Sequence, residues 1–301
     1  MKKVKILGPS YSGTTVLGYV LNTSPGWFFG SEVHRLLYSY IQRYGARNKN
    51  IANPKCDFCG LECKYWSRKL LMELKENKVD TLQGIYDVFE SHHPEVSVFV
   101  DGSKKLDFFH DTEVDYTLIA SKHPVRLLAS RFYNKRESLG VKGEELSSVY
   151  SAIQRDKAKF LDYAKGEINY LYLAYSDFFK NSANGMLVKM DEIVFSEKHK
   201  NDFLDFLDLN YDDVSFDGFT NYEIHSIGGN RAPYWARLEK STDKLVSNPR
   251  HEYYKSAESV GDFKVDDKYK EIFDDDFLSE IEMLVEYQEL LKILGYKRML
   301  V

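Results

Sequence analysis

The loop Gly8-Pro-Ser-Tyr-Ser-Gly-Thr-Thr15 constrains the fold of this chain more than any other stretch. Residues 4–7 before it are apolar enough for a buried strand, and residues 14–21 after it are typical of a helix. A strand, a glycine-bearing loop and a helix together present backbone N–H groups and the positive end of a helix dipole to an anion. We therefore expect this loop to bind a phosphate group, the alternative being a turn that binds nothing.

The spacing of the loop is that of a Walker motif, but Thr14 stands where the motif requires Lys. Enzymes that act on nucleoside triphosphates meet the charge of the phosphates with that Lys and a magnesium ion. A ligand with a single phosphate at this point fits the loop better. The candidate binding residues are Pro9, Ser10, Tyr11, Ser12, Gly13, Thr14 and Thr15.

Composition excludes several classes of protein. Asp and Glu together number 46 and Lys and Arg 41, so the net charge of −5 does not favour a nucleic-acid binder. No stretch approaches the roughly 18 apolar residues of a membrane span, and the basic N-terminus lacks the apolar region of a signal peptide. Three cysteines, an odd number, fit a reducing compartment. We expect a soluble, cytoplasmic protein, and the 22 Tyr and 19 Phe predict an aromatic-rich core.

Strands and helices alternate along the rest of the chain. Apolar runs predict strands at 27–29, 96–100, 116–120 and 186–190. Helical patterns cover about 30–44, 67–76, 81–91, 125–136, 144–182, 197–207 and 277–294. This alternation predicts an α/β fold with a central parallel sheet flanked by helices, with ligand-binding loops at the carboxyl ends of the strands. We expect a single domain over 1–301, with insertions that shape an acceptor site at about 45–66, 144–182 and 210–275.

Within the long helical region, Phe160, Tyr163, Tyr170, Ala174 and Phe178 keep to one face, with a weak point at Gly166. An aromatic stripe at helical spacing is typical of a core-facing helix.

Several segments together resemble the sulfotransferases that use 3′-phosphoadenosine 5′-phosphosulfate (PAPS). Ser12-Gly-Thr-Thr15 resembles their 5′-phosphosulfate loop, and Lys122-His-Pro followed by Ser130 has the spacing of their 3′-phosphate site. Four further stretches are similar to the bacterial and Golgi-type branch of the family. They are Gly30-Ser-Glu32, the Cys56-x-x-Cys-Gly-x-x-Cys63 cluster with Trp66, Asp101-Gly-Ser-Lys104, and residues 225–230.

The resemblance implies a P-loop-like sulfotransferase fold, PAPS as co-substrate and no metal requirement. It implies that Lys122 and Ser130 hold the 3′-phosphate, with Arg126 and Arg131 on the same helix as helpers. A late loop with Arg231 and Arg237 would close over the 3′-phosphate and adenine. Tyr11 stands where many members have Lys or Arg, and Lys122 stands where Arg is usual, so a planar fork becomes a point charge.

The resemblance also assigns the reaction residues. Glu32 matches the catalytic Glu of the members that sulfate protein tyrosines, so it is the candidate base, with His34 as the second candidate. The alternative for Glu32 is a helix N-terminal carboxylate that stabilises the helix dipole. Lys104 is the candidate cation for the sulfuryl or bridging oxygen, and would partly replace the charge missing at Tyr11. Its alternative is a solvated surface Lys.

Cys56, Cys59 and Cys63 allow three interpretations: a zinc site with a fourth ligand such as His34, a redox-active group, or buried thiols that order a loop. Zinc sites prefer four ligands and the local cluster supplies three, so we expect the ordered loop and no metal.

The predicted function is transfer of a sulfuryl group from PAPS to a hydroxyl or amine of a small-molecule, carbohydrate or lipid-headgroup acceptor. A P-loop-like small-molecule kinase is the alternative enzyme, and Thr14 in the Lys position is the feature against it. A non-catalytic module that binds a nucleotide or an anion is the third hypothesis, and Tyr11 and Lys122 are the residues that favour it.

Overall fold

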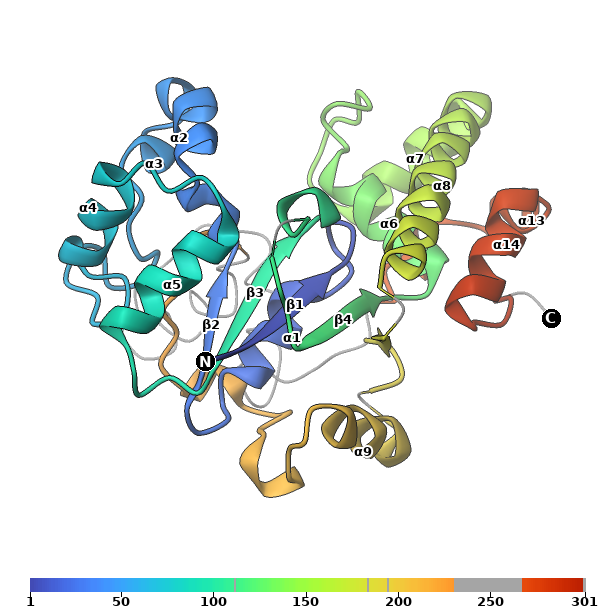
Figure 1. The fold of residues 1–301 in the computed structure, drawn as a ribbon. Helices are drawn as coiled ribbons and strands as arrows, with labels where there is room; N and C mark the ends of the chain where they lie inside the picture. The colour runs from blue at the N-terminus through green and yellow to red at the C-terminus, as the bar shows by residue number, and fades with distance from the viewer. Residues whose placement is uncertain (111, 183, 194, 230–266, 300–301) are drawn as a thin grey trace. The chain divides into compact units, whose positions relative to one another are not determined.

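The computed structural model describes residues 1–110, 112–182, 184–193, 195–229 and 267–299, which form an α/β fold around a five-stranded sheet (Figure 1). The strands are β1 (Lys2–Leu7), β2 (Trp27–Ser31), β3 (Val98–Lys104), β4 (Tyr116–Ser121) and β5 (Gly185–Lys189). Their order in the sheet is β2-β3-β1-β4-β5. The predicted α/β architecture, with a central sheet and flanking helices, is confirmed.

The register of the first three strands brings their carboxyl ends together. β3 pairs in parallel with β1 on one side, where Leu7 lies opposite Lys104. It pairs in parallel with β2 on the other, where Ser31 lies opposite Asp101. Both pairings are irregular just before these ends, as is common for strands next to functional sites. The segment before the glycine loop and the predicted reaction residues therefore lie at one edge of the sheet.

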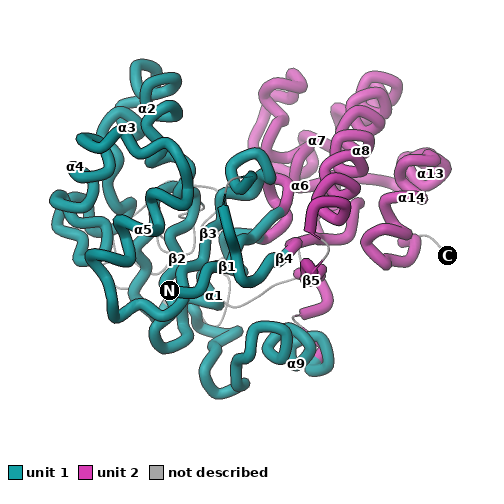
Figure 2. Tube along the Cα trace, viewed as in Figure 1, with its two compact units in different colours: residues 1–7, 14–118, 197–263 teal, residues 8–13, 119–196, 264–301 magenta. Residues whose placement is uncertain are grey.

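The chain divides into two compact units (Figure 2). Unit 1 comprises Met1–Leu7, Thr14–Leu118 and Glu197–Phe263, and unit 2 comprises Gly8–Gly13, Ile119–Ser196 and Lys264–Val301. Each unit is assembled from segments that are far apart in the sequence. One boundary between the units falls inside the glycine loop: residues 8–13 belong to unit 2, and Thr14 and Thr15 belong to unit 1.

Unit 1 has an aromatic core, as the composition predicts. Its helices are α1 (Thr14–Leu21), α2 (Tyr38–Tyr44), α3 (Lys49–Ala52), α4 (Arg68–Glu76), α5 (Leu82–His92) and α9 (Glu197–Phe206), with a 3₁₀ turn η1 (Val33–Leu36). Phe89 of α5 packs on Phe28 of β2 and Phe99 of β3, with 4.8 Å between ring centroids in both pairs. Aromatic contacts of this kind attach α5 to the sheet.

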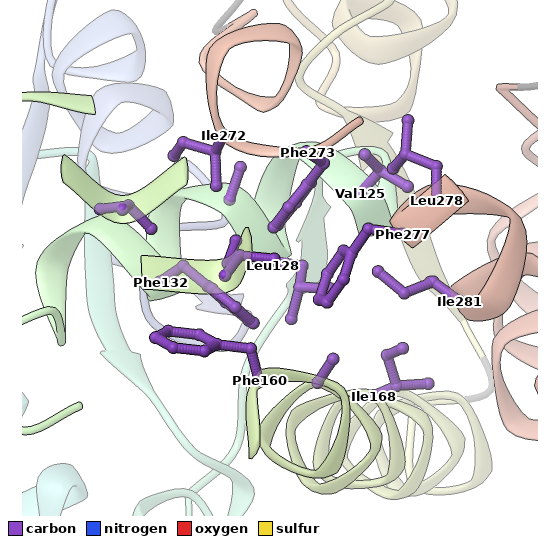
Figure 3. Close-up of a cluster of buried hydrophobic side chains, with 14 of the residues drawn as sticks. Val125, Leu128, Phe132, Phe160, Ile168, Ile272, Phe273, Phe277, Leu278 and Ile281 are labelled. Carbon is purple, nitrogen blue, oxygen red and sulfur yellow. The ribbon is translucent and has the colours of Figure 1, made fainter. Parts of the chain in front are cut away.

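Unit 2 has a separate hydrophobic core (Figure 3). Its helices are α6 (Pro124–Asn134), α7 (Leu146–Arg155), α8 (Lys157–Lys180), α12 (Tyr269–Ile272), α13 (Asp275–Glu282) and α14 (Val285–Leu294). The ring of Phe132 in α6 packs on Phe160 of α8 and on Phe273, at centroid distances of 5.8 and 5.3 Å. Aromatic side chains thus join α6 and α8 to the chain just before α13.

Three predicted helices have different boundaries in the structure. The segment at Gly30 continues β2 through Ser31, and only the turn η1 and then α2 follow. The region 144–182 is two helices, because Asp156 caps the second by accepting from the Lys159 N–H (3.3 Å). The closing helix is also two, α13 and α14, which are separated at Met283 and Leu284.

The predicted stripe on α8 is only partly correct. Phe160 and Phe178 are buried, but Tyr170 is 44% exposed. The helix continues through Gly166 without a break. Among the described helices, none combines the length and the apolar character needed to cross a bilayer.

Candidate functional site

Four of the predicted segments meet in unit 1. Leu7, the last residue of β1, is paired with Lys104 of β3. The loop at Gly228 and Gly229 reaches the end of β2, where the Ser31 hydroxyl donates to the Gly228 carbonyl (3.1 Å). A Cβ added at Gly229 would lie 2.4 Å from Ser31 Oγ and 3.4 Å from Thr15 Cγ2, so the first turn of α1 is adjacent as well. Gly229 has a φ of +92°, so glycine is required there for both space and conformation.

Glu32 and Lys104, predicted separately, form a direct ion pair. Glu32 Oε1 accepts from Lys104 Nζ, and Oε2 pairs with Arg35. The Glu32 carboxyl is buried, which would raise its pKa, but the charges of Lys104 and Arg35 outweigh the burial and hold the pKa below its usual value. Glu32 therefore carries a charge at neutral pH and keeps two cations in place.

The backbone at this site is strained. Ser31 and Lys104 have φ angles of +65° and +73°, a backbone conformation that residues other than Gly rarely adopt. Each such residue costs on the order of 1–3 kcal/mol and persists only where its surroundings enforce it, most often at functional sites. Glu32 stands at the N-cap position of the four-residue 3₁₀ turn η1 and not of a regular helix, and its side chain makes no capping bond.

A chain of hydrogen bonds holds the end of β3. The backbone N–H of His34 donates to Ser103 Oγ (3.1 Å), and Ser103 donates to Asp101 Oδ1 from its hydroxyl (2.6 Å) and its N–H (2.7 Å). The Tyr86 hydroxyl donates to Asp101 Oδ2 (2.7 Å). Asp101 is 1% exposed, and its burial raises its pKa to about 6, although these hydrogen bonds oppose the rise.

Tyr86→Phe should cost more stability above pH 6 than below it. Because the folded pKa of Asp101 is raised, its contribution to stability is complete below about pH 4 and is lost as the pH rises through about 6. The Tyr86 hydroxyl offsets that loss by donating to the charged form, so its removal should cost about 2 kcal/mol at pH 8 and about 1 kcal/mol at pH 5. Urea denaturation at the two pH values measures the difference.

The matched control for this prediction is Tyr287→Phe in unit 2. The Tyr287 hydroxyl is buried and has no hydrogen-bond partner among the described residues. Its removal should change stability equally at pH 5 and pH 8. Equal losses at both pH values for Tyr86→Phe as well would contradict the assignment of the raised pKa to Asp101.

His34, the second candidate base, is packed against aromatic rings. Its ring stacks on Phe108 with 4.3 Å between centroids and meets the edge of Tyr40 at 5.1 Å. Burial lowers the pKa of His34 to about 4, so the ring is neutral at physiological pH and is a weak base. The pKa of Glu32 is lowered as well, so what favours Glu32 over His34 is its direct contact with Lys104 and not its basicity.

The first part of the glycine loop lies in unit 2. The N–H of Ser12 donates to the Pro9 carbonyl (3.2 Å), which forms a turn, and Tyr11 has a φ of +76°. A Cβ added at Gly13 would lie 2.7 Å from Met190 Cγ, just beyond β5, so the loop packs closely there. Pro9 and Ser12 are buried, and Ser10 is exposed.

The predicted 3′-phosphate residues lie on and just before α6, in unit 2. Lys122 precedes the helix, and Ser130 is a buried residue of α6 itself. The helper Arg126 pairs with Asp267 (2.8 Å) and Asp191 (3.5 Å). Arg131 pairs with Glu167 of α8 and donates to the Ser10 carbonyl (3.4 Å). A phosphate at either Arg would therefore compete with a carboxylate. Arg231 and Arg237 lie outside the described residues.

The cysteine segment has a fourth partner that the sequence prediction missed. His225 lies beside Cys59 and Cys63, so it supplies a fourth ligand atom in addition to the three cysteine sulfurs. His34, the fourth ligand suggested from sequence, is not in this group. His225 belongs to the stretch 225–230 that resembles the sulfotransferases, and a histidine is a usual fourth zinc ligand beside three cysteines, which is the signal the sequence carries for it.

No protein-family model matches the chain, and a search of curated proteins found no match. The functional assignment therefore depends on the chain's own residues.

Proposed function

We propose that the chain is a PAPS-dependent sulfotransferase with a P-loop-like fold. The observation that carries the proposal is the ion pair of Glu32 and Lys104 at the carboxyl ends of neighbouring strands. Lys104 lies opposite Leu7, the residue that leads into the glycine loop. A carboxylate and an ammonium group are the two charged groups that the proposed sulfuryl transfer needs.

In the proposed reaction, an acceptor hydroxyl attacks the sulfur of PAPS while the bond from sulfur to the bridging phosphate oxygen breaks. Glu32 takes the proton of the hydroxyl. Lys104 stabilises the charge that develops on the sulfuryl and bridging oxygens, and adenosine 3′,5′-bisphosphate leaves with the electron pair. Before the donor binds, Glu32 is paired with Lys104. A phosphosulfate would compete for Lys104, which lets the carboxylate act as a base.

The contacts of Asp101 support this proposal over a kinase. Nucleoside-triphosphate enzymes of the P-loop type hold magnesium with a loop hydroxyl and a strand-end Asp. Asp101 lies within β3, three residues before its end, and its two carboxylate oxygens accept from Ser103 and Tyr86. A carboxylate engaged in this way is a poor ligand for a hydrated magnesium ion, and Thr14 replaces the Lys that would accompany it.

Thermal stabilisation by nucleotides tests the proposal. Adenosine 3′,5′-bisphosphate at about 100 times its Kd should stabilise the protein by about 2.7 kcal/mol, or roughly 5 °C in Tm, and ATP with magnesium should not. Lys122→Ala with Ser130→Ala should remove the shift if these residues hold the 3′-phosphate. Radiolabelled sulfuryl transfer from PAPS to a panel of phenols, sugars and lipid headgroups then tests for turnover.

Three outcomes separate the hypotheses. A Tm shift with ATP and magnesium alone would favour the kinase and overturn the proposal. A shift with adenosine 3′,5′-bisphosphate but no transfer to any acceptor in the panel would favour the non-catalytic binding module. An unchanged shift in the double variant would show that Lys122 and Ser130 do not form the 3′-phosphate site.

A further inference from the structure

A second cluster in unit 1 has the composition of a metal centre. The ligand atoms of Cys56, Cys59, Cys63 and His225 all lie within 4.8 Å of one another. His225 Nδ1 is 3.2 Å from Cys59 Sγ and 3.4 Å from Cys63 Sγ. Four ligands at zinc distances in a tetrahedron are about 3.5–3.8 Å apart. We propose that this cluster binds Zn²⁺ as a closed, four-coordinate structural site.

The backbone around the cysteines is arranged to support thiolates. The N–H of Cys59 donates to Cys56 Sγ (3.5 Å), and the N–H of Trp66 donates to Cys63 Sγ (3.3 Å). Gly60 donates to the Cys56 carbonyl (3.1 Å) and has a φ of +66°, which closes a tight turn directly after Cys59. These bonds hold the first two cysteines in a turn and offset part of the negative charge that three thiolates would carry.

His225 is oriented as a ligand by its other ring nitrogen. Nε2 lies 3.4 Å from Glu223 Oε2, and that oxygen also accepts from Lys64 Nζ (2.6 Å). A carboxylate at Nε2 keeps the proton there, so the lone pair of Nδ1 points at the thiols. In many zinc sites a carboxylate accepts a hydrogen bond from the ring nitrogen of the histidine that does not bind the metal. Neither a disulfide nor a set of free thiols requires such a carboxylate.

The site would fix one segment of unit 1 to another more than 160 residues away in sequence. Asp57 donates from its backbone to the Ser226 carbonyl (2.9 Å). Ile227 then bonds the end of β2 through Gly30 (3.1 Å) and Glu32 (2.9 Å). Zinc at His225 would therefore stabilise the segment that supports Glu32. All four ligands come from the protein, which leaves no open position for a substrate and indicates a structural ion. The inference does not depend on the proposed function.

Metal analysis of the full-length protein, purified without chelators, tests the inference. We expect one Zn²⁺ per chain. Exchange for Co²⁺ should give the visible bands of tetrahedral cobalt and a thiolate-to-cobalt charge-transfer band. Removal of the metal should lower Tm, and added Zn²⁺ should restore it. A protein without metal that gains none from added Zn²⁺ or Co²⁺, or one isolated with a disulfide in this cluster, overturns the proposal.

Variants of His225 make the test specific. His225→Gln should weaken Zn²⁺ binding by more than the roughly 10–100-fold that loss of a residue supporting a ligand costs, since it removes a ligand itself. His225→Cys should keep the zinc as a four-cysteine site with a stronger charge-transfer band in the cobalt form. The control is His110→Gln, which replaces an exposed histidine of the same unit and should change nothing. If His225→Gln does not fold, His225→Cys still decides: an unaltered cobalt spectrum would exclude His225 as a ligand.

Discussion

Glu32→Gln should lower the rate of sulfuryl transfer by about 10²–10⁴-fold, the range expected for loss of a general base. The same change should leave the affinity for adenosine 3′,5′-bisphosphate within about threefold. The amide is nearly isosteric with the carboxylate, but it cannot take a proton from the acceptor. Steady-state kinetics with PAPS and an acceptor identified from the panel give the first quantity, and calorimetric titration gives the second.

Because Glu32 and Lys104 form an ion pair, substitutions of the two residues should affect turnover and nucleotide affinity differently. Lys104 and Arg35 both face Glu32, and loss of the carboxylate frees Lys104 for an incoming anion. Nucleotide affinity should therefore not fall in Glu32→Gln. Lys104→Met, in contrast, should lower both turnover and affinity, because the ammonium contacts the leaving phosphate in the proposed reaction.

Glu197→Gln is the matched control, because it changes an exposed Glu of α9 in the same unit. It should leave both quantities unchanged. A parallel loss of turnover and nucleotide affinity in Glu32→Gln would instead mean that Glu32 acts only by holding the two cations in place.

The strands were predictable where their sequences are continuously apolar, as at residues 98–100 and 118–120. Such runs are typical of strands that are buried on both faces. The extension of β3 through Asp101 to Lys104 was not predictable, because Asp, Gly and Lys have low strand propensity. Pairing with strands on both sides overrides that propensity in β3, and pairing with β3 extends the edge strand β2 through Gly30 and Ser31.

A local sequence signal marks the break between α7 and α8 in the helical region at 144–182. Asp156 is a favourable N-cap residue, and its carboxylate accepts from the Lys159 N–H. The exposure of Tyr170 has a different cause. The buried face of α8 includes the charged residue Glu167, so a stripe drawn through aromatic residues alone misplaces that face.

The individual residues of the candidate site could be predicted from the sequence, but their contacts with one another could not. Glu32 and Lys104 were selected by resemblance, and the sequence contains nothing that shows their direct pairing or the part of Arg35. His225 lies more than 160 residues from the cysteines. The bond from the Asp57 N–H to the Ser226 carbonyl links the two segments, and the parallel bridge between Ser31 and Ile227 ties residue 227 to the end of β2. Pairings at such sequence separation follow from topology, which local patterns do not encode.

Glu167→Ala should destabilise the protein by about 3–5 kcal/mol, the cost of leaving a buried charge without its partner. Glu167 is buried and pairs with Arg131, which is buried as well, and with Lys135 Nζ (2.6 Å). Lys135→Ala is the control: its side chain is 42% exposed, so the loss should stay within about 1 kcal/mol. Urea denaturation measures both.

The pH dependence and a double variant distinguish this explanation from simple loss of packing. Burial would raise the pKa of Glu167, but Lys135 and Arg131 outweigh it and lower the pKa, so the pair stabilises the fold above about pH 4.3 and weakens as the pH falls through the lowered value. The loss of stability in Glu167→Ala should therefore become smaller at acidic pH.

The double variant Glu167→Leu with Arg131→Met should recover most of the stability, because no buried charge remains. Arg131 also holds the Ser10 carbonyl (3.4 Å), so a double variant that is stable but binds nucleotide weakly would show that the pair positions the glycine loop. A deficit that is constant with pH and persists in the double variant would contradict an electrostatic origin.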